Sequence, residues 1–313
     1  MSNVLATDEK AKNLSNPMTN ALVIGGNGFL GRHLVEQLVS GGVKVTSIVR
    51  QKRQDIVASE QFTFEEFQDP SCHKERSRFD CVFDLAANIS VDEALKGKLG
   101  FTLENVAITL RNFSLVANLE FVGAYIYVGS DRGLVLDSGH NNLLDPYGRG
   151  KLIGSLLTKH LQMPPIMRTG TVILPNLWGA GQKSSQLLPT LIRRIIKGED
   201  SIGLKSLDGG RNYLHVNDAA RGLICLSGHE WSDQVEYLSG EYIELKHLLN
   251  EVGSSARRCL EREIKFYQLD HPEGWKREDF HSPPRTLDDY FARSILSWCP
   301  RMSIKTHVDS LFS

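Results

Sequence analysis

Seven residues near the start of the chain, running Gly-Gly-Asn-Gly-Phe-Leu-Gly from Gly25 to Gly31, constrain its fold more than any other feature. They follow an apolar run at 21–24 that predicts a buried strand, and they open a segment at 29–40 whose apolar residues have helical spacing. A second, β-branched strand is predicted at 43–49. Together these segments form a strand–helix–strand unit of about thirty residues, which is the format of a parallel sheet.

The alternation of strand and helix continues along the chain. Strands are predicted at 62–67, 81–85 and 124–128, and helices at 101–119 and 147–161. This succession predicts an α/β fold with a doubly wound parallel sheet of the Rossmann type. Beyond residue 165, glycine and proline break the pattern, and helices are predicted at 187–197, 216–226 and 245–258.

These patterns predict three parts of the chain. We expect a flexible tail at 1–19 and a dinucleotide-binding Rossmann domain with the catalytic residues at 20–165. Residues 166–313 are expected to form mainly a smaller α/β substrate-binding lobe, partly threaded back onto the Rossmann sheet.

The composition argues against several functional classes. Lysine and arginine number 36 against 37 aspartates and glutamates, a balance that does not suit a nucleic-acid or membrane-surface binder. The five cysteines are widely spaced and form no C-x-x-C pair, which indicates reduced thiols. The ten histidines show no metal-ligand spacing, and the sequence contains neither a signal-peptide core nor an apolar run long enough to span a membrane. We therefore expect a cytoplasmic protein with no metal, nucleic-acid or membrane partner.

The glycine run predicts a dinucleotide site. It matches both G-x-x-G-x-x-G and G-x-G-x-x-G, which allow the backbone to approach a pyrophosphate at a helix N-terminus. The alternative is an ordinary glycine turn between a strand and a helix. At the end of the second strand, where an NAD enzyme usually carries an acidic residue, this chain has Arg50, Gln51, Lys52 and Arg53. Cations suit a 2′-phosphate, so NADP(H) is favoured over NAD(H), with a solvated basic loop as the alternative.

A second motif predicts acid–base chemistry. Tyr147 and Lys151 match Y-x-x-x-K and share one face of a helix, so that the ammonium can lower the pKa of the phenol. Tyr147 could then exchange a proton with a substrate while hydride moves to or from the cofactor. Ser130, at the end of the preceding strand, could bind the reacting oxygen. The alternative is a surface helix with an incidental tyrosine and lysine.

With these motifs, the chain resembles the extended short-chain dehydrogenase/reductases, the NAD(P)-dependent epimerase/dehydratase family that acts on nucleotide-sugars. The resemblance rests on the glycine loop, on Leu85-Ala86-Ala87, on the Ser130, Tyr147 and Lys151 set, and on the segments 211–218 and 296–300. It implies a nucleotide-sugar substrate, a structural role for Asn105, a substrate-phosphate contact for Arg211, and a homodimer in which the helices at 101–119 and 147–161 pair across a two-fold axis.

The motifs and the resemblance together give a set of predicted site residues. The catalytic set is Ser130, Tyr147 and Lys151. The substrate-binding set is Ser130, Asp131, Asn176 and Arg211. The cofactor-binding set is Gly25, Gly28, Phe29, Leu30, Gly31, Arg50, Arg53, Asp69, Leu85, Ala86, Ala87, Asn105, Tyr147 and Lys151.

The chain also departs from the family pattern. Asp84 stands where the family often has histidine, and only 16 residues separate Ser130 from Tyr147. Arg132 occupies the position of the glutamate base of the sugar dehydratases, and a guanidinium cannot act as that base. This disfavours a dehydratase. Because the basic cluster at 50–53 favours NADP(H) and NADPH suits net reduction, we predict an NADP(H)-dependent reductase of a 4-keto sugar nucleotide. The alternatives are a 4-epimerase that retains its cofactor and a non-catalytic dinucleotide sensor.

Overall fold

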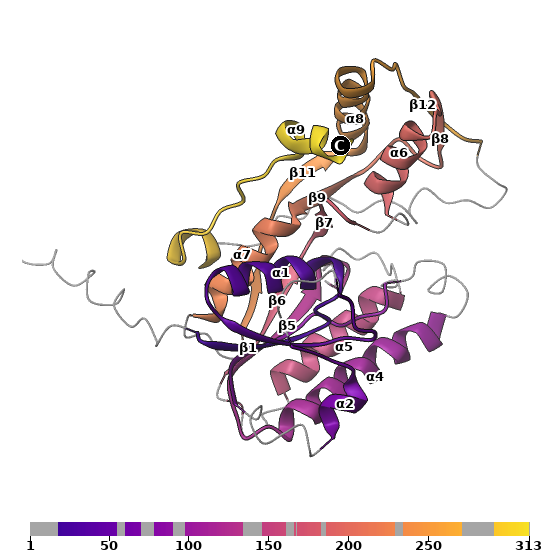
Figure 1. Ribbon diagram of the computed structural model, residues 1–313. Coiled ribbons are helices and arrows are strands. Elements are labelled where there is room, and N and C mark those ends of the chain that lie inside the picture. Colours follow the sequence, from indigo (N-terminus) through magenta and orange to yellow (C-terminus); the bar gives the residue numbers. More distant parts are fainter. Residues whose placement is uncertain are drawn as a thin grey trace, which may run out of the picture.

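The computed structural model describes residues 18–54, 60–69, 78–89, 98–133, 146–160, 166, 168–182, 186–228, 234–270 and 291–312. Most of the predicted tail at 1–19 and of the segment at 131–146 lies outside these residues, as do Cys72, Trp231 and Trp275. Figure 1 shows a lower part that contains the sheet with its flanking helices and an upper lobe with smaller strands and helices.

The described chain contains a seven-stranded sheet of order β10-β6-β5-β4-β1-β2-β3, in which every neighbouring pair is parallel. Its strands are β1 (Asn20–Ile24), β2 (Lys44–Ile48), β3 (Glu60–Phe62), β4 (Arg78–Asp84), β5 (Phe121–Ser130), β6 (Thr169–Leu174) and β10 (Gln234–Tyr237). The strand order reverses direction between β1 and β4, which is the arrangement of a doubly wound Rossmann sheet. The predicted fold class is confirmed.

Helices cover both faces of this sheet because successive side chains of each strand point to opposite faces. On one face, α1 (Phe29–Ser40) and α7 (Val216–Ser227) pack against the sheet in a cluster that includes Val23, Phe83 and Ile126. The other face carries α2 (Phe64–Gln68), α4 (Lys98–Ala117) and α5 (Pro146–His160), and its cluster includes Leu22, Val82 and Tyr125 (Figure 1).

The upper lobe has two small sheets, of order β11-β9-β7 and β12-β8. Its elements are β7 (Asn176–Trp178), α6 (Leu187–Ile196), β8 (Ser201–Leu204), β9 (Gly210–His215), β11 (Glu241–Glu244), α8 (Leu245–Leu260), β12 (Lys265–Gln268), α9 (Ile304–His307) and the 3-10 helix η5 (Val308–Leu311). A separate apolar cluster that includes Trp178, Ile195 and Leu248 forms its core. The strands β6 and β10 belong to the central sheet although both follow residue 165, and the predicted domain division stays a prediction.

The family-like segments 211–218 and 296–300 meet at one residue, Asp218. Asp218, in the first turn of α7, accepts hydrogen bonds from the backbone N–H groups of Arg301 (2.8 Å) and Met302 (2.9 Å) and pairs with Arg221 at 2.7 Å. The indole of Trp298 donates to the carbonyl of Asp218 at 3.2 Å. The C-terminal segment, which includes the π-helical turn η4 (Phe291–Ile295), is therefore fastened to α7.

One predicted element is wrong. The segment 62–67 was expected to be a strand, but only Glu60–Phe62 is a strand, and Phe64–Gln68 forms the helix α2. The physical reason is a capping box: Thr63 accepts from the N–H of Glu66, and Glu66 accepts from the N–H of Thr63. The other predicted helices and strands are present, with ends that differ by a few residues.

Candidate active site

The glycine loop lies where the strand order reverses, between the ends of β2 and β4. The N–H of Gly25 donates to the carbonyl of Ile48 at the end of β2, at 2.8 Å. Gly25 has φ of 91°, and a Cβ there would lie 3.2 Å from the backbone nitrogen of Ala86 beyond β4. Glycine is favoured by both the left-handed conformation and this close approach. The loop is therefore held against the segment that carries Leu85, Ala86 and Ala87.

The start of α1 fits a pyrophosphate. A Cβ on Gly31 would lie 2.2 Å from the carbonyl oxygen of Gly25 and 2.8 Å from the Cα of Gly26, so the helix and the loop touch through their backbones. The N-cap residue is Gly28, which has no side chain to bind the first N–H groups of the helix. Those groups and the positive end of the helix dipole suit an anion. This backbone cradle is what a bound dinucleotide requires.

The basic residues after β2 are joined to the same loop. Asn27, inside the glycine run, donates from Nδ2 to the carbonyl of Gln51 at 2.6 Å. The side chain of Gln61 binds both the N–H and the carbonyl of Arg53, at 2.9 and 2.8 Å. Neither Asn27 nor Gln61 was singled out from the sequence, since their partners become neighbours only in the fold.

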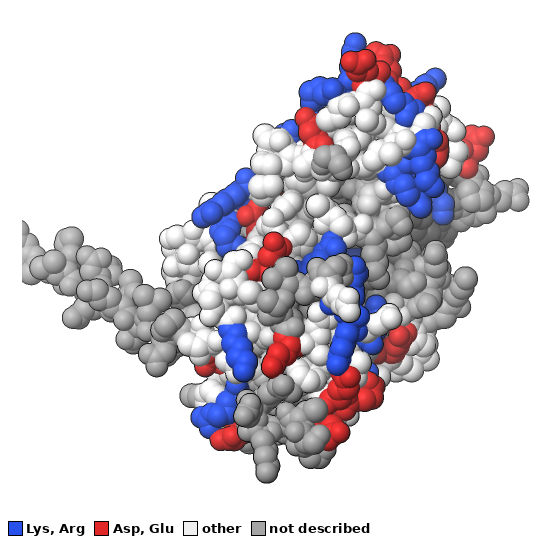
Figure 2. Space-filling view, viewed as in Figure 1, with Lys and Arg blue, Asp and Glu red and all other residues white. Residues whose placement is uncertain are grey.

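The basic side chains after β2 are exposed. Arg50, Lys52 and Arg53 all reach the surface, and Lys52 pairs with Glu66 at 2.8 Å. Figure 2 shows the molecule from the same side as Figure 1. On that face, Lys and Arg side chains form a run near the middle, with acidic side chains below them. Exposed cations next to the glycine loop are compatible with the predicted 2′-phosphate contact.

The predicted catalytic residues lie on two elements that pack together. Ser130 ends β5 and is followed by the short 3-10 helix η2 (Asp131–Gly133). The Oγ of Ser130 accepts from the N–H of Arg132 at 3.3 Å and lies 3.4 Å from Oδ1 of Asp131. The guanidinium of Arg132 lies 5.5 Å from the centre of the Tyr147 ring, at the start of α5. The structure therefore brings the strand end with Ser130 next to the helix turn with Tyr147.

Lys151 projects from α5 into the protein interior. Its side chain is buried, and its Nζ lies 4.3 Å from the centre of the Tyr127 ring. Burial lowers the pKa of Lys151 to about 8, while the nearby carboxyl of Asp84 acts in the opposite direction. A lysine with this pKa is still mainly an ammonium at neutral pH and can release its proton more readily than an exposed lysine.

Asp84 is a buried acid that the sequence marked only as a departure from the family. It accepts hydrogen bonds from Oη of Tyr125 at 2.5 Å, from Nδ2 of Asn112 at 2.9 Å and from the N–H of Ala86 at 3.2 Å. Burial raises the pKa of Asp84, and the three donors together with Lys151 oppose this rise. The detectable signal in the sequence was a charge directly after the apolar residues Cys81–Phe83 of the predicted strand.

Asn105 binds the backbone of the segment that follows β4. This buried side chain accepts from the N–H of Asn88 at 2.9 Å and donates to the carbonyls of Asn88 and Phe101, both at 3.2 Å. It therefore fixes the chain directly after Ala86 and Ala87. A structural role matches what the resemblance implied, and a direct contact of Asn105 with the cofactor stays a prediction.

The remaining predicted residues are more scattered. Asn176 begins β7, two residues after Leu174, which pairs in register with Ser130. Arg211 lies on β9 of the small sheet, where its guanidinium donates to the carbonyl of Gly210 at 2.9 Å. Asp69 is exposed at the end of α2. Asn176 thus lies near the catalytic edge of the sheet, and the ligand contacts of all three residues stay predictions.

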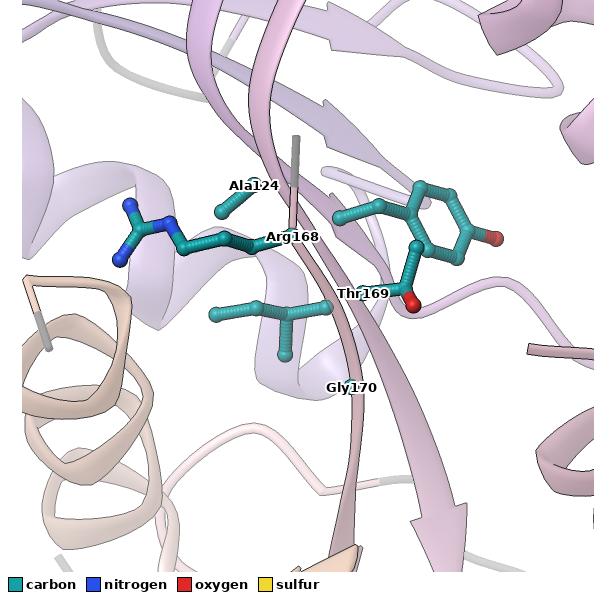
Figure 3. A pocket seen from close by; sticks show the side chains of 6 residues that line it. Ala124, Arg168, Thr169 and Gly170 are labelled. Atoms are coloured by element: carbon teal, nitrogen blue, oxygen red, sulfur yellow. The ribbon is translucent and has the colours of Figure 1, made fainter. Parts of the chain in front are cut away.

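A shallow hollow beside Arg168 is not part of this site. It is lined by Ala124, Tyr125, Ile126, Arg168, Thr169 and Gly170 and has no room for a water molecule. Figure 3 shows Arg168 at the start of the strand, with its side chain directed away from Thr169. This is the opposite end of β5 and β6 from Ser130. Among the described residues, no group of acidic, histidine or cysteine side chains could hold a metal, and no helix is long and apolar enough to cross a membrane.

Comparisons with known proteins identify the family of this chain. Residues 21–236 match the NAD dependent epimerase/dehydratase family. A dTDP-glucose 4,6-dehydratase of Actinoplanes sp. is 26% identical over 267 residues, which cover 76% of this chain and 83% of the relative. The structure of MoeE5 in complex with UDP-glucose and NAD is 21% identical, with a TM-score of 0.74, and the match covers 94% of this chain and 97% of that chain.

A second solved structure, RMD from Pseudomonas aeruginosa complexed with NADPH, is 19% identical, with a TM-score of 0.72 and coverage of 94% and 97%. At these identities the two solved structures show the shared fold. The family match covers the glycine loop, the end of β4 and the Ser130, Tyr147 and Lys151 set. The chain therefore belongs to the NAD-dependent epimerase/dehydratase family and is an enzyme of the extended short-chain dehydrogenase/reductase type.

Proposed function

We propose that this enzyme is an NADP(H)-dependent reductase of a nucleotide-linked 4-keto sugar. The observation that carries the proposal is the pairing of η2 with the first turn of α5, which sets the strand end of Ser130 beside Tyr147 and the buried Lys151. Mere binding of a dinucleotide would need no such arrangement of acid–base groups, and this disfavours a non-catalytic sensor.

The residues that would hold the cofactor fit it. The backbone of the glycine loop and the start of α1 would receive the pyrophosphate, and Arg50 and Arg53 would receive the 2′-phosphate. Lys151 would bind the nicotinamide ribose. When bound, the nicotinamide would supply the hydride, and this chain's own residues would supply orientation and the proton.

Tyr147 is the proposed proton donor to the substrate oxygen. Ser130, on the neighbouring strand end, would bind the same oxygen and align it with the phenol. The buried ammonium of Lys151 would stabilise negative charge on Tyr147 as the proton leaves, because a charge in a poorly hydrated site acts strongly on its neighbours. A net reduction requires no further role from the side chains of the protein beyond these three.

Arg132 disfavours dehydration. It lies over the Tyr147 ring, where the sugar dehydratases need a carboxylate that removes a proton from carbon. A guanidinium stays protonated and cannot perform that step. A 4-epimerase needs the same Tyr147 and Lys151 as a reductase, so epimerisation remains the alternative to be tested.

The first experiment measures the loss of NADPH and NADH absorbance with the purified protein and a panel of nucleotide-linked 4-keto-6-deoxy sugars. We expect stoichiometric oxidation of NADPH, much slower oxidation of NADH, and a loss of the preference in Arg50→Ala/Arg53→Ala. Tyr147→Phe should lower turnover by about 10²–10⁴-fold while the cofactor still binds. No oxidation with any ketosugar, together with interconversion of 4-epimers, would overturn the reductase in favour of the epimerase.

A homodimer is proposed on the outer side of α4 and α5, which contact one another. Leu99, Leu103 and Leu110 on α4 are 69%, 55% and 46% exposed, and Ile153 and Leu156 on α5 are 37% and 48% exposed. Large apolar side chains at helical spacing on two adjacent helices suit an isologous interface.

Light scattering after size exclusion tests this interface. Leu103→Glu should give a monomer, whereas Ile196→Glu, which changes an equally exposed residue on α6 of the upper lobe, should not alter the mass. A wild-type monomer at micromolar concentration would contradict the proposed dimer.

A further inference from the structure

The strand β4 places a carboxylate inside the protein at the catalytic edge of the sheet. Asp84 has 0% of its surface exposed and accepts hydrogen bonds from three parts of the chain: Tyr125 on β5, Asn112 on α4 and Ala86 in the segment after β4. Burial raises the pKa of Asp84, whereas the three converging donors oppose this rise, because an ionised carboxylate only accepts hydrogen bonds. A buried negative charge of this kind needs a positive partner.

Lys151 faces the same space from α5. Asp84 is in register with Tyr127 on the neighbouring parallel strand, so both side chains point to the face that α4 and α5 cover. The ammonium of Lys151 lies 4.3 Å from the centre of the Tyr127 ring. The ring attracts the cation through its π face but cannot neutralise it, and Lys151 is only 3% exposed to water.

We propose that Asp84 is a positioning residue for Lys151: its buried carboxylate balances the buried ammonium and holds it in the charged, inward-pointing form. The role of Lys151 at the nicotinamide ribose and beside Tyr147 rests on the proposed function, but the charge interaction between Asp84 and Lys151 does not depend on which sugar is reduced.

Among the described residues around Lys151, Asp84 is the fully buried carboxylate. Burial lowers the pKa of Lys151, and Asp84 is the group that opposes this effect. The phenols of Tyr125 and Tyr127 have raised pKa values because they are buried beside Asp84, so they stay neutral at physiological pH. Helix α4 contributes the uncharged side chains of Thr102, Asn105 and Thr109, and strand β6 contains no charged residue. The charged neighbours are Asp131 and Arg132 of η2, which are not buried, and Tyr147 lies on α5 itself.

The test is an NMR titration of the full-length protein with ¹⁵Nζ-labelled lysine, with Lys151 assigned by Lys151→Met. The wild-type midpoint of Lys151 is expected near pH 8. In Asp84→Asn, which keeps the shape and an acceptor for Ala86, the midpoint should fall by one pH unit or more. The ammonium fraction at pH 7 would then fall from about 90% to about 50% or less.

Tyr125→Phe is the matched control, since it removes one hydrogen bond to Asp84 and keeps the carboxylate. A purely structural role predicts similar effects for Asp84→Asn and Tyr125→Phe; the proposed role predicts a large shift of the Lys151 midpoint only in Asp84→Asn. The affinity for NADPH should also decline with rising pH at a lower midpoint in Asp84→Asn than in the wild type.

Where Asp84→Asn does not fold, the reciprocal measurement decides. By linkage, Lys151→Met should raise the pKa of Asp84, read from its carboxyl ¹³C shift, by as much as the Asp84 charge raises that of Lys151. A Lys151 midpoint within about 0.3 unit of wild type in Asp84→Asn, or an Asp84 titration unchanged in Lys151→Met, would overturn the inference. These titrations need no substrate, so they stand whether or not any ketosugar is reduced.

Discussion

Replacing Gly31 with alanine perturbs the contact between α1 and the glycine loop without adding charge or polarity. The new Cβ would lie 2.2 Å from the carbonyl oxygen of Gly25, 2.8 Å from the Cα of Gly26 and 2.9 Å from its carbonyl carbon. All three are backbone atoms, and Gly25 is held by the hydrogen bonds Gly25 N–H to Ile48 O and Gly28 N–H to Gly25 O. No side-chain rotation can relieve the clash, so the loop must move away from the helix.

The expected cost follows from this geometry. Overpacking of this kind costs about 1–3 kcal/mol. Because the displaced loop is also the proposed pyrophosphate contact, a comparable free energy should be lost from cofactor binding, which corresponds to roughly 5- to 150-fold weaker affinity. Fluorescence titration with NADPH and NADH measures this affinity, and urea unfolding measures the stability of the unliganded protein.

Gly253→Ala on α8 is the matched control for this substitution. Its Cβ would meet only an ordinary contact, 3.6 Å from the Phe266 ring, so affinity should stay at the wild-type value. The reasoning is refuted if Gly31→Ala binds both cofactors as tightly as the wild type and unfolds at the same urea concentration.

Three further outcomes are expected. Asp218→Asn removes a buried charge that accepts two backbone hydrogen bonds of 2.8 and 2.9 Å, and should lower the free energy of unfolding in urea by about 2–3 kcal/mol. Burial lowers the pKa of His215 in the folded protein, so the unfolded chain binds a proton at this side chain more readily. The free energy of unfolding should therefore fall as the pH falls through about 6.5, the ordinary pKa of histidine. His215→Asn should flatten this dependence in thermal melts. Gly154→Ala would place a Cβ 2.2 Å from Oη of Tyr127, and should reduce turnover more than NADPH affinity by shifting α5.

The parts of the fold that could be predicted are those in which one physical constraint dominates. Buried parallel strands must be apolar along their length, and the helices beside them repeat their apolar residues at helical spacing. The strands at 21–24 and 124–128 and the helices at 29–40 and 147–161 were visible for this reason. Helix α2 was missed because three phenylalanines at 62, 64 and 67 suggested a strand, although Thr63 and Glu66 carried a capping-box signal.

The candidate site was predictable only in its motifs. The glycine loop and the Tyr147–Lys151 pair are local patterns, and their spacing carries their chemistry. The environment of Asp84 is not local: Asn112 lies 28 residues away and Tyr125 lies 41 residues away in the sequence. An isolated aspartate in a strand has no visible partner until β5 and α4 are folded against it, so the sequence could show only that Asp84 was unusual.

The helix that carries Tyr147 and Lys151 shows why such a site depends on residues without side chains. Glycine lowers helix stability by about 1 kcal/mol relative to alanine, yet α5 contains glycine at 148, 150 and 154. A Cβ on Gly148 would strike the carbonyl of Arg132 on η2, one on Gly150 would approach Asn105 on α4, and one on Gly154 would strike Tyr127 on β5. Each glycine thus permits contact with a different element that carries part of the site. The lost helix propensity is offset by packing, which sets Tyr147 against η2 and Lys151 against Tyr127. The positions of the proposed catalytic groups therefore depend on the close contacts of the α5 backbone at these glycines as much as on their own side chains.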